Sequence, residues 1–242
     1  MNKSYFVIVG ELLVKIEKTQ SENIAAAAEI VARTIVNDGL IYIFGCGHSH
    51  IIAEDSFYRA GGLANVYPVF CSDLMLHVGA SRSSVLEKDE NNAKGLLDKY
   101  KFSENDCFVV ISTSGINGVP IETALEAKRK GLPVIAIYSS AYSAEKSHRS
   151  SGKKLSEVAD VAVDNLVPHG DAVIKLDGCD AATGAVSTAL SCSVMQAITL
   201  KAEEISLSRG IKPSVFVSGN VEGGAEYNRE ILKRYKGRID EL

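Results

Sequence analysis

The chain contains, near its centre, the segment Val109-Val110-Ile111-Ser112-Thr113-Ser114-Gly115-Ile116-Asn117-Gly118-Val119-Pro120-Ile121-Glu122. Its apolar start predicts a buried strand, and Pro120 stands where the first turn of a helix is expected. A hydroxyl-rich loop with two glycines joins the two elements. The start of a helix offers unpaired backbone N–H groups and a partial positive charge. We therefore expect an anion site here, and phosphate is the anion that fits it.

A similar strand, glycine loop and helix precede this segment. The run Leu40-Ile41-Tyr42-Ile43-Phe44 predicts a strand buried on both faces, and Gly45-Cys46-Gly47-His48-Ser49-His50 follows it. His50 stands where a dinucleotide-binding loop has its third glycine, so a dinucleotide oxidoreductase is an alternative that rests on an incomplete motif. Gly45 and Gly47 let the backbone approach an anion, and a tight structural turn is the other interpretation.

The rest of the pattern alternates between strands and helices. Apolar positions at helical spacing predict a helix over residues 5–38, with a division at Thr19-Gln20-Ser21-Glu22 as an alternative. Further elements are expected as strands at 66–70, 132–138, 158–164 and 214–219, and as helices from 120 to 130, 185 to 208 and 226 to 242. This order favours a doubly wound, mostly parallel α/β fold. In such sheets ligands bind beyond the carboxyl ends of the strands, so both loops are expected to face one crevice.

Composition limits the function classes. The chain has 242 residues, which suits one large α/β domain or two small ones. Lys and Arg number 26 against 30 Asp and Glu, and no strongly basic stretch occurs, so nucleic acid is not an expected partner. The apolar patch at 5–9 is too short for a membrane span. The five cysteines are scattered and odd in number, which predicts reduced core thiols in a cytoplasmic protein.

Residues 72–98 show no clear period, and the sequence leaves open whether they form a lid or part of a ligand pocket. We interpret Glu87-Lys88-Asp89-Glu90 within this segment as a solvated face.

These motifs resemble the SIS (sugar isomerase) domain over roughly residues 35 to 205. The likeness is carried by Ser112-Thr113-Ser114-Gly115 and by Gly45-x-Gly47-x-Ser49, each placed between a strand and a helix. With Arg59-Ala60-Gly61-Gly62 and Val119-Pro120-Ile121-Glu122, the chain is similar to the stand-alone UPF0309 group and to phosphoheptose isomerase-like proteins.

The resemblance implies a three-layer α/β/α fold with a five-stranded, mostly parallel sheet. It implies a single SIS domain over residues 1–242, with an N-terminal helical extension (about 1–38) and a C-terminal strand and helix extension (about 210–242). A phosphosugar ligand, a homodimer or homotetramer and no cofactor are also implied. Matched residue by residue, the phosphate contacts are Ser112, Thr113 and Ser114, and Ser49 matches the serine of the first loop. Asn117 occupies a position where the family usually has Thr or Ser, and its amide can still donate.

Two departures concern catalysis. Placed without gaps on the phosphoheptose isomerases, Arg59 falls on their catalytic Glu, and residues 187–203 contain no counterpart of their helical His. Arg59 is then expected to pair either with a substrate anion or with a carboxylate of the protein. The chain also has no helix-turn-helix domain and no second SIS copy.

Aldose–ketose isomerisation needs a base that moves a proton between adjacent carbons and an acid that opens the ring. The candidates are Glu54, His169 and Glu222, and the ordinary alternative for each is a surface or capping role. His48 is expected to contact a sugar hydroxyl. His48 and His50 lack further ligands at metal spacing, so no metal site is expected.

The sequence therefore predicts a protein that binds a phosphorylated sugar or sugar derivative, as an isomerase or a related lyase. The alternative is a non-catalytic phosphosugar sensor that regulates a partner.

Overall fold

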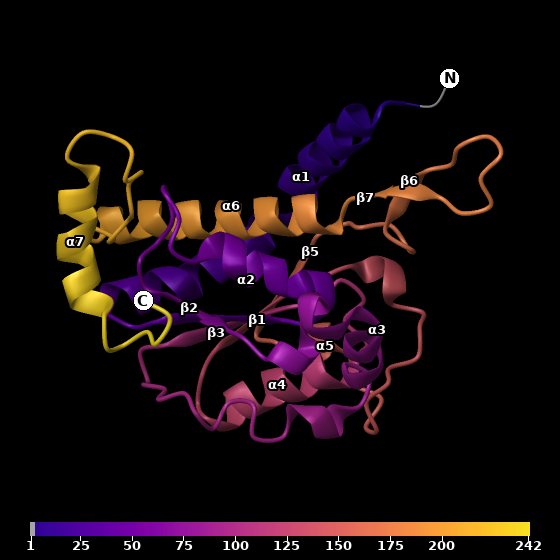
Figure 1. The fold of residues 1–242 in the computed structure, drawn as a ribbon, viewed down its shortest axis with the longest axis horizontal. Coiled ribbons are helices and arrows are strands. Elements are labelled where there is room, and N and C mark those ends of the chain that lie inside the picture. Colours follow the sequence, from indigo (N-terminus) through magenta and orange to yellow (C-terminus); the bar gives the residue numbers. More distant parts are fainter. Residues whose placement is uncertain (1–2) are drawn as a thin grey trace.

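The computed structural model describes residues 3–242 and has a five-stranded parallel sheet at its centre (Figure 1). The strand order is β2-β1-β3-β4-β5, with every neighbouring pair parallel. The strands are β1 (Ile41–Gly45), β2 (Val66–Val69), β3 (Cys107–Ile111), β4 (Val134–Tyr138) and β5 (Val161–Asp164). The α/β class, the doubly wound order and the five parallel strands expected from the sequence and its resemblance are confirmed.

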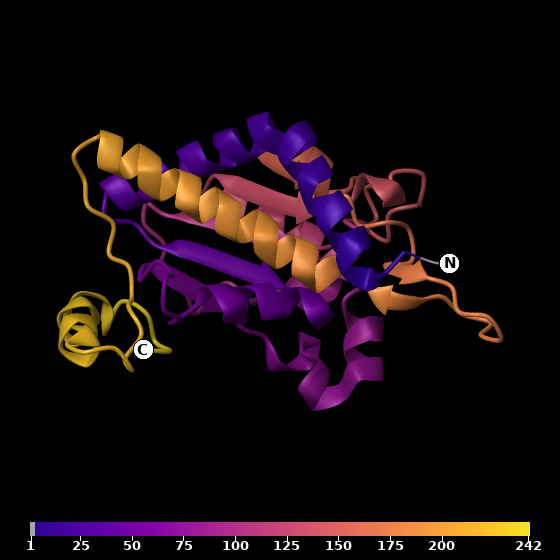
Figure 2. The ribbon, with the colours of Figure 1, turned by 90° about the horizontal axis from the view of Figure 1, so that it is seen from above.

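The two faces of the sheet are covered by different helices (Figure 1), and Figure 2 looks down onto one of these faces. One face carries α1 (Tyr5–Val36), α2 (His50–Ser56) and α6 (Ser187–Ser208). The other carries α4 (Gly118–Arg129) and α5 (Leu155–Val158). The helix α3 (Leu76–Leu86) packs on the short 3-10 turns η1 (Gly47–Ser49) and η2 (Ser72–Leu74), and two further turns of this kind are η3 (Glu90–Ala93) and η4 (Ser140–Tyr142). The helix expected over 5–38 is confirmed as one element, and the alternative division is wrong, because α1 runs unbroken through Thr19 and Glu22.

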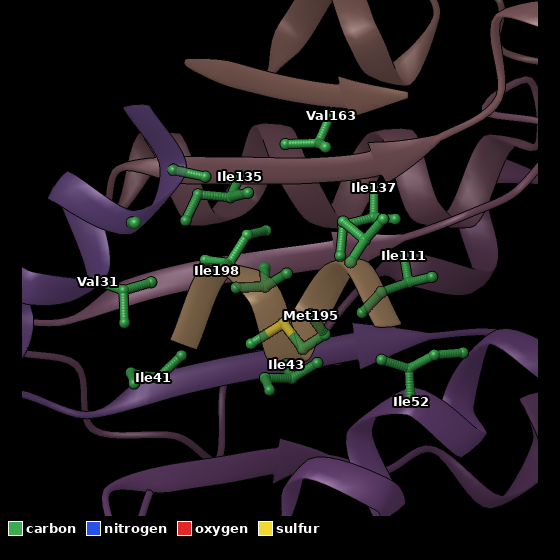
Figure 3. Packing of buried hydrophobic residues seen from close by; sticks show 14 of the residues in the cluster. Val31, Ile41, Ile43, Ile52, Ile111, Ile135, Ile137, Val163, Met195 and Ile198 are labelled. Atoms are coloured by element: carbon green, nitrogen blue, oxygen red, sulfur yellow. The ribbon is translucent and has the colours of Figure 1, made fainter. Parts of the chain in front are cut away.

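Alternating strand residues supply the two cores. Ile41, Ile43 and Ile111 point toward α6, where Met195 and Ile198 meet them (Figure 3). Their chain neighbours Tyr42, Phe44, Phe108 and Val110 point to the other face and belong to a core cluster that includes the buried side of α4. Both faces of β1 and β3 are therefore buried, which explains their continuous apolar sequences.

The C-terminal segment lies along the amino edge of the sheet. The strand expected at 214–219 is not formed, and only an isolated antiparallel bridge joins Val215 to Leu63. The terminal helix α7 (Gly224–Tyr235) is shorter than expected. Arg234 and Arg238 fix it by binding the Asp38 carboxylate at 2.8 and 3.0 Å, just before β1.

A hairpin that the sequence pattern did not indicate lies at the opposite end of the molecule from α7 (Figure 1). Its strands are β6 (Ala172–Ile174) and β7 (Thr183–Ala185), and they pair antiparallel. Its loop carries Cys179, which is exposed, so the expectation that every cysteine lies in the core is wrong for this residue. No helix in residues 3–242 is long and apolar enough to cross a membrane.

Candidate functional site

The strand order creates a switch point between β1 and β3. After β1 the chain continues into α2 on one face of the sheet, and after β3 it continues through a loop into α4 on the other face. The two connections therefore diverge from neighbouring strands at the carboxyl edge, which leaves a crevice in folds of this order. Both glycine and serine loops predicted to bind an anion lie at this edge.

The loop after β3 presents a row of free donors. The backbone N–H groups of Thr113, Ser114, Ile116 and Asn117 donate to no group within residues 3–242. Gly115 holds the turn between them with a φ of +62°, in the left-handed region. Successive backbone N–H groups around such a residue form a concave seat for an anion. The half-exposed side chains of Thr113, Ser114 and Asn117 stand beside it.

Ser112 fixes the shape of this loop. Its side chain is buried, and its hydroxyl oxygen accepts a hydrogen bond from the N–H of Gly115 at 3.3 Å. The hydroxyl proton is still available for donation to a ligand. The carbonyl groups of Gly115 and Ile116 point away and accept from Leu155 and His148, each at 2.9 Å. The loop is thus anchored through its carbonyl groups, and its free amides remain available to an anion.

The expected donors at the start of the helix are not available. The N–H groups of Gly118 and Val119 donate to the carbonyl oxygens of Lys88 and Glu87 at 3.2 and 3.0 Å. Pro120 has no N–H. A Cβ atom on Gly118 would lie 2.4 Å from the Lys88 carbonyl oxygen, so only glycine allows this contact. The sequence-based expectation that the amides at the start of α4 are free is therefore not met, and the free amides lie in the preceding loop.

The loop after β1 is a tight turn. A Cβ atom on Gly45 would lie 2.5 Å from the Ser49 carbonyl carbon, and Gly47 has a φ of +54°. The N–H of Ser49 donates to the carbonyl of Cys46 at 2.9 Å. The side chain of Ser49 is half-exposed and has no hydrogen bond within residues 3–242, and His48 is exposed. Both can therefore reach a ligand, while the glycines serve the turn itself.

His50 and Glu54 form a pair on α2. The buried His50 ring contacts the Gly47 carbonyl through Nδ1, and its Nε2 lies 3.4 Å from Oε1 of the exposed Glu54. This places Glu54 one helical turn behind the first loop. No group of three or more His, Cys, Asp or Glu side chains in the described part of the chain could hold a metal ion.

Arg59 is held by a carboxylate of its own chain. It pairs with Asp55 through both the side chain and the backbone carbonyl, and Gln196 of α6 contacts the other Asp55 oxygen at 3.5 Å. Of the two roles expected for Arg59, the ion pair with a protein carboxylate is the one seen. The structure also gives α6 no histidine between Ser187 and Ser208.

The remaining two catalytic candidates lie apart from each other. His169 follows β5 at the carboxyl edge, stacks on Tyr142 and places Nε2 3.1 Å from Oε1 of Glu145. Glu222 is exposed in the turn before α7, which lies at the amino edge of the sheet (Figure 1). The structure thus places Glu54 on α2 behind the first loop and His169 at the carboxyl edge after β5, and it leaves Glu222 at the other end of the molecule.

A small cavity of about 160 Å³ adjoins the anion loop on the β4 side. Ser114, Tyr138 and Lys154 line it, and the Lys154 ammonium group donates to the carbonyl of Ser143. The sequence analysis did not select Lys154, because its segment shows only a polar composition.

Glu87 is the second residue that sequence reasoning missed. The run Glu87-Lys88-Asp89-Glu90 was expected to be a solvated face, but Glu87 is half-buried and only Lys88 and Asp89 are exposed. Burial raises the pKa of the Glu87 carboxyl above its usual value, and Lys88 opposes this shift. Its environment depends on packing against α4, which the local pattern does not reveal.

Comparisons with known proteins agree with this fold. A family model described as SIS domain matches residues 4–139. The UPF0309 protein of Thermoanaerobacter pseudethanolicus is 42% identical over 233 residues, covering 94% of each chain. The UPF0309 protein of Listeria innocua is 42% identical over 240 residues, covering 99% of this chain and 97% of the relative.

Solved structures give a more distant likeness. A phosphoheptose isomerase from Francisella tularensis superposes with a TM-score of 0.53 at 16% identity, covering 83% of this chain and 95% of that one. The phosphoheptose isomerase of Neisseria gonorrhoeae has a TM-score of 0.50 at 20% identity, covering 84% and 95%. At these identities the likeness concerns the fold alone.

Proposed function

This chain belongs to the UPF0309 family of SIS-domain proteins, and from that premise we propose that it binds a phosphorylated sugar at the β1/β3 switch point. The observation that carries the proposal is the row of unpaired N–H groups at Thr113, Ser114, Ile116 and Asn117. Four backbone donors around one left-handed glycine suit the oxygens of a phosphate group. The hydroxyl groups of Ser112, Thr113 and Ser114 add donors at the same place.

The sugar would extend from this seat toward the loop after β1. Ser49 and His48 are accessible there, and Asn117 stands at the start of α4 with a free side-chain amide. Each offers a hydrogen bond to a hydroxyl group. We propose that they orient the sugar and that the amides after β3 supply most of the phosphate affinity.

The proposed reaction is an aldose–ketose isomerisation or a related elimination. Both begin with removal of a proton from a carbon next to a carbonyl group, which needs a base beside the sugar. Glu54 and His169 stay candidates because they lie at the carboxyl edge, and Glu222 would require a different arrangement. Arg59 is paired with Asp55, and α6 lacks histidine, so the proposal does not use the phosphoheptose isomerase's Glu and His pair.

A non-catalytic sensor is the second candidate function. It is favoured by an accessible anion loop combined with Arg59 at the position expected for a catalytic Glu. A sensor would bind the same phosphosugar and leave it unchanged.

We also propose that the chain forms a homodimer or homotetramer through α1 and α6. A groove of about 620 Å³ runs between these helices, and its lining includes Val14 and Leu200, which are 48% and 60% exposed. A second copy placing the same two helices there would cover both side chains. Light scattering after gel filtration measures the mass, and replacing Leu200 with Glu should reduce it to that of a monomer.

Thermal unfolding in the presence of sugar phosphates tests the binding proposal. A ligand that binds only the folded state raises the melting temperature. We expect a rise with one sugar phosphate and none with its unphosphorylated parent. Inorganic phosphate at millimolar concentration should give a smaller rise. The variant Thr113→Ala combined with Ser114→Ala should weaken the effect, and Ser81→Ala, on the exposed side of α3, should not. No rise with any phosphate would contradict the proposal.

A further inference from the structure

Glu87 lies where the two loops of the switch point come together. Its backbone carbonyl accepts the N–H of Val119, at the end of the anion loop. Burial raises the pKa of the Cys46 thiol, in the loop after β1, and the negative charge of the Glu87 carboxylate adds to this shift. The backbone of Glu87 thus contacts the connection after β3, and the charge of its side chain acts on the connection after β1.

The carboxylate of Glu87 is also unpaired within the described part of the chain. It is half-buried, its oxygen atoms still reach solvent, and it has no hydrogen bond or ion pair within residues 3–242. The neighbouring acidic residues are used differently. Asp89 accepts the N–H of Asn91 at 2.9 Å, and Glu90 accepts from the N–H and hydroxyl of Ser150 at 3.0 and 2.6 Å. Glu87 is therefore the acid of this turn that no structural contact explains.

A carboxylate in this setting is suited to proton transfer. Partial burial disfavours its charged form, and Lys88 offsets this only in part, so it accepts a proton more readily than a carboxylate in water. By contrast, Glu54 is exposed and paired with His50.

We propose that Glu87 is the general base that moves a proton between adjacent carbon atoms of the bound sugar phosphate. The inference rests on the proposed function, because it requires the sugar to lie between the two loops. The backbone of Glu87 would fix the base to the start of α4, so that the base and the phosphate seat hold a constant distance.

The step balances without any further reactant. The Glu87 carboxylate takes the proton from C2 of the open-chain aldose, and the C–H electron pair forms the C1–C2 double bond. The carbonyl oxygen on C1 takes a proton from solvent to complete the enediol. Glu87 then returns its proton to C1 while the hydroxyl on C2 loses one to solvent and becomes the ketone. C2 is oxidised and C1 reduced within the same molecule.

The test measures exchange of carbon-bound hydrogen with solvent. The full-length protein is incubated in D₂O with ribose 5-phosphate, glucose 6-phosphate or sedoheptulose 7-phosphate, and deuterium on the sugar is followed by NMR. The variants are Glu87→Gln and Glu54→Gln, with Glu104→Gln as an exposed control. Binding of the same sugars to each variant is measured in parallel by thermal unfolding. Removal of a general base should slow exchange at least about 100-fold.

The expected result is exchange by the unmodified protein, loss of it in Glu87→Gln with the ligand-induced rise in melting temperature retained, and no change in Glu104→Gln. Exchange that persists in Glu87→Gln overturns the role of Glu87 and leaves the proposed function intact. Binding without exchange in the unmodified protein also overturns it and favours the sensor. If no sugar phosphate binds, the proposed function fails, and the role of Glu87 fails with it.

Discussion

The hydroxyl oxygen of Ser112 accepts a hydrogen bond from the N–H of Gly115, and this contact closes a turn whose two intervening amides donate to no group within residues 3–242. Both residues are buried, whereas the Thr113 and Ser114 side chains between them are half-exposed. Ser112 therefore stabilises the loop from its buried side, in addition to any contact that its hydroxyl proton makes with a ligand.

Replacing Ser112 with Ala should lower both stability and ligand affinity. The buried N–H of Gly115 would lose its acceptor, which costs about 1 kcal/mol of unfolding free energy. The urea midpoint measures the first effect, and the rise in melting temperature with a sugar phosphate measures the second. Ser81→Ala is the control. Unchanged affinity in Ser112→Ala would contradict the role given to this loop.

Two glycine-to-alanine changes should alter the free energy of unfolding in opposite directions. Gly10 lies within α1, and an added Cβ would meet no atom within 4 Å, so Gly10→Ala should stabilise the protein by about 0.5–1 kcal/mol. Gly118→Ala should destabilise it by about 1–3 kcal/mol, because the Cβ would meet the Lys88 carbonyl oxygen and the Glu90 nitrogen at 2.4 and 2.5 Å. Urea unfolding of both variants gives the comparison. Equal effects would mean that the 87–90 turn moves freely away from α4.

Acidification should release α7 from the sheet. Burial acts to raise the pKa of Asp38, but hydrogen bonds from Arg238 and Arg234 outweigh it and hold the pKa below its usual value. A carboxyl group with a lowered folded-state pKa contributes stability above its unfolded-state pKa of about 3.9, and the contribution is lost as the pH falls through the folded-state value. Hydrogen exchange in residues 224–235 should therefore accelerate below about pH 4.

The variant Asp38→Asn should show faster exchange in the same residues already at pH 7. Asp98→Asn, on an exposed carboxylate, provides the comparison. Protection of α7 that is the same in Asp38→Asn and the unmodified protein would assign its docking to apolar contacts such as that of Tyr235.

The carboxyl group of Glu87 should affect stability with the opposite pH dependence to that of Asp38. The folded-state pKa of Glu87 is raised by burial, so its contribution to stability is favourable below the unfolded-state pKa of about 4.3 and is lost as the pH rises through the folded-state value. Glutamine removes that loss. Glu87→Gln should melt at a higher temperature than the unmodified protein at pH 8, and the difference should disappear near pH 4. A lower melting temperature at pH 8 would reveal a stabilising contact of the carboxylate.

The sheet and its loops could be predicted from sequence because the strands are short, apolar and separated by glycine. The hairpin β6–β7 was not predicted, since residues 175–182 between its strands are exposed and carry no apolar alternation. The strand expected at 214–219 is apolar enough, but it has no strand to pair with along its length. Its apolar side chains are covered as expected, with Phe216 against Tyr58, and its backbone forms only one bridge, between Val215 and Leu63.

The loop of the candidate site could be selected from sequence, but its free donors could not. Ser112 to Ser114 stand out by their place between an apolar strand and a helix, whereas the use of the Gly118 and Val119 amides depends on the backbone of Glu87 and Lys88, some 30 residues away. The same packing buries Glu87, so one tertiary contact accounts for both differences from the sequence-based expectation.

The divergence of the β1 and β3 connections has a mechanical consequence. One connection continues into α2 beside α6, and the other into α4 beside α5, so a ligand bound by both would cross-link the two helical layers through a single small molecule. Occupancy of the crevice would then be felt on both outer surfaces of the protein at once, and any partner resting on either layer would sense whether the sugar is present.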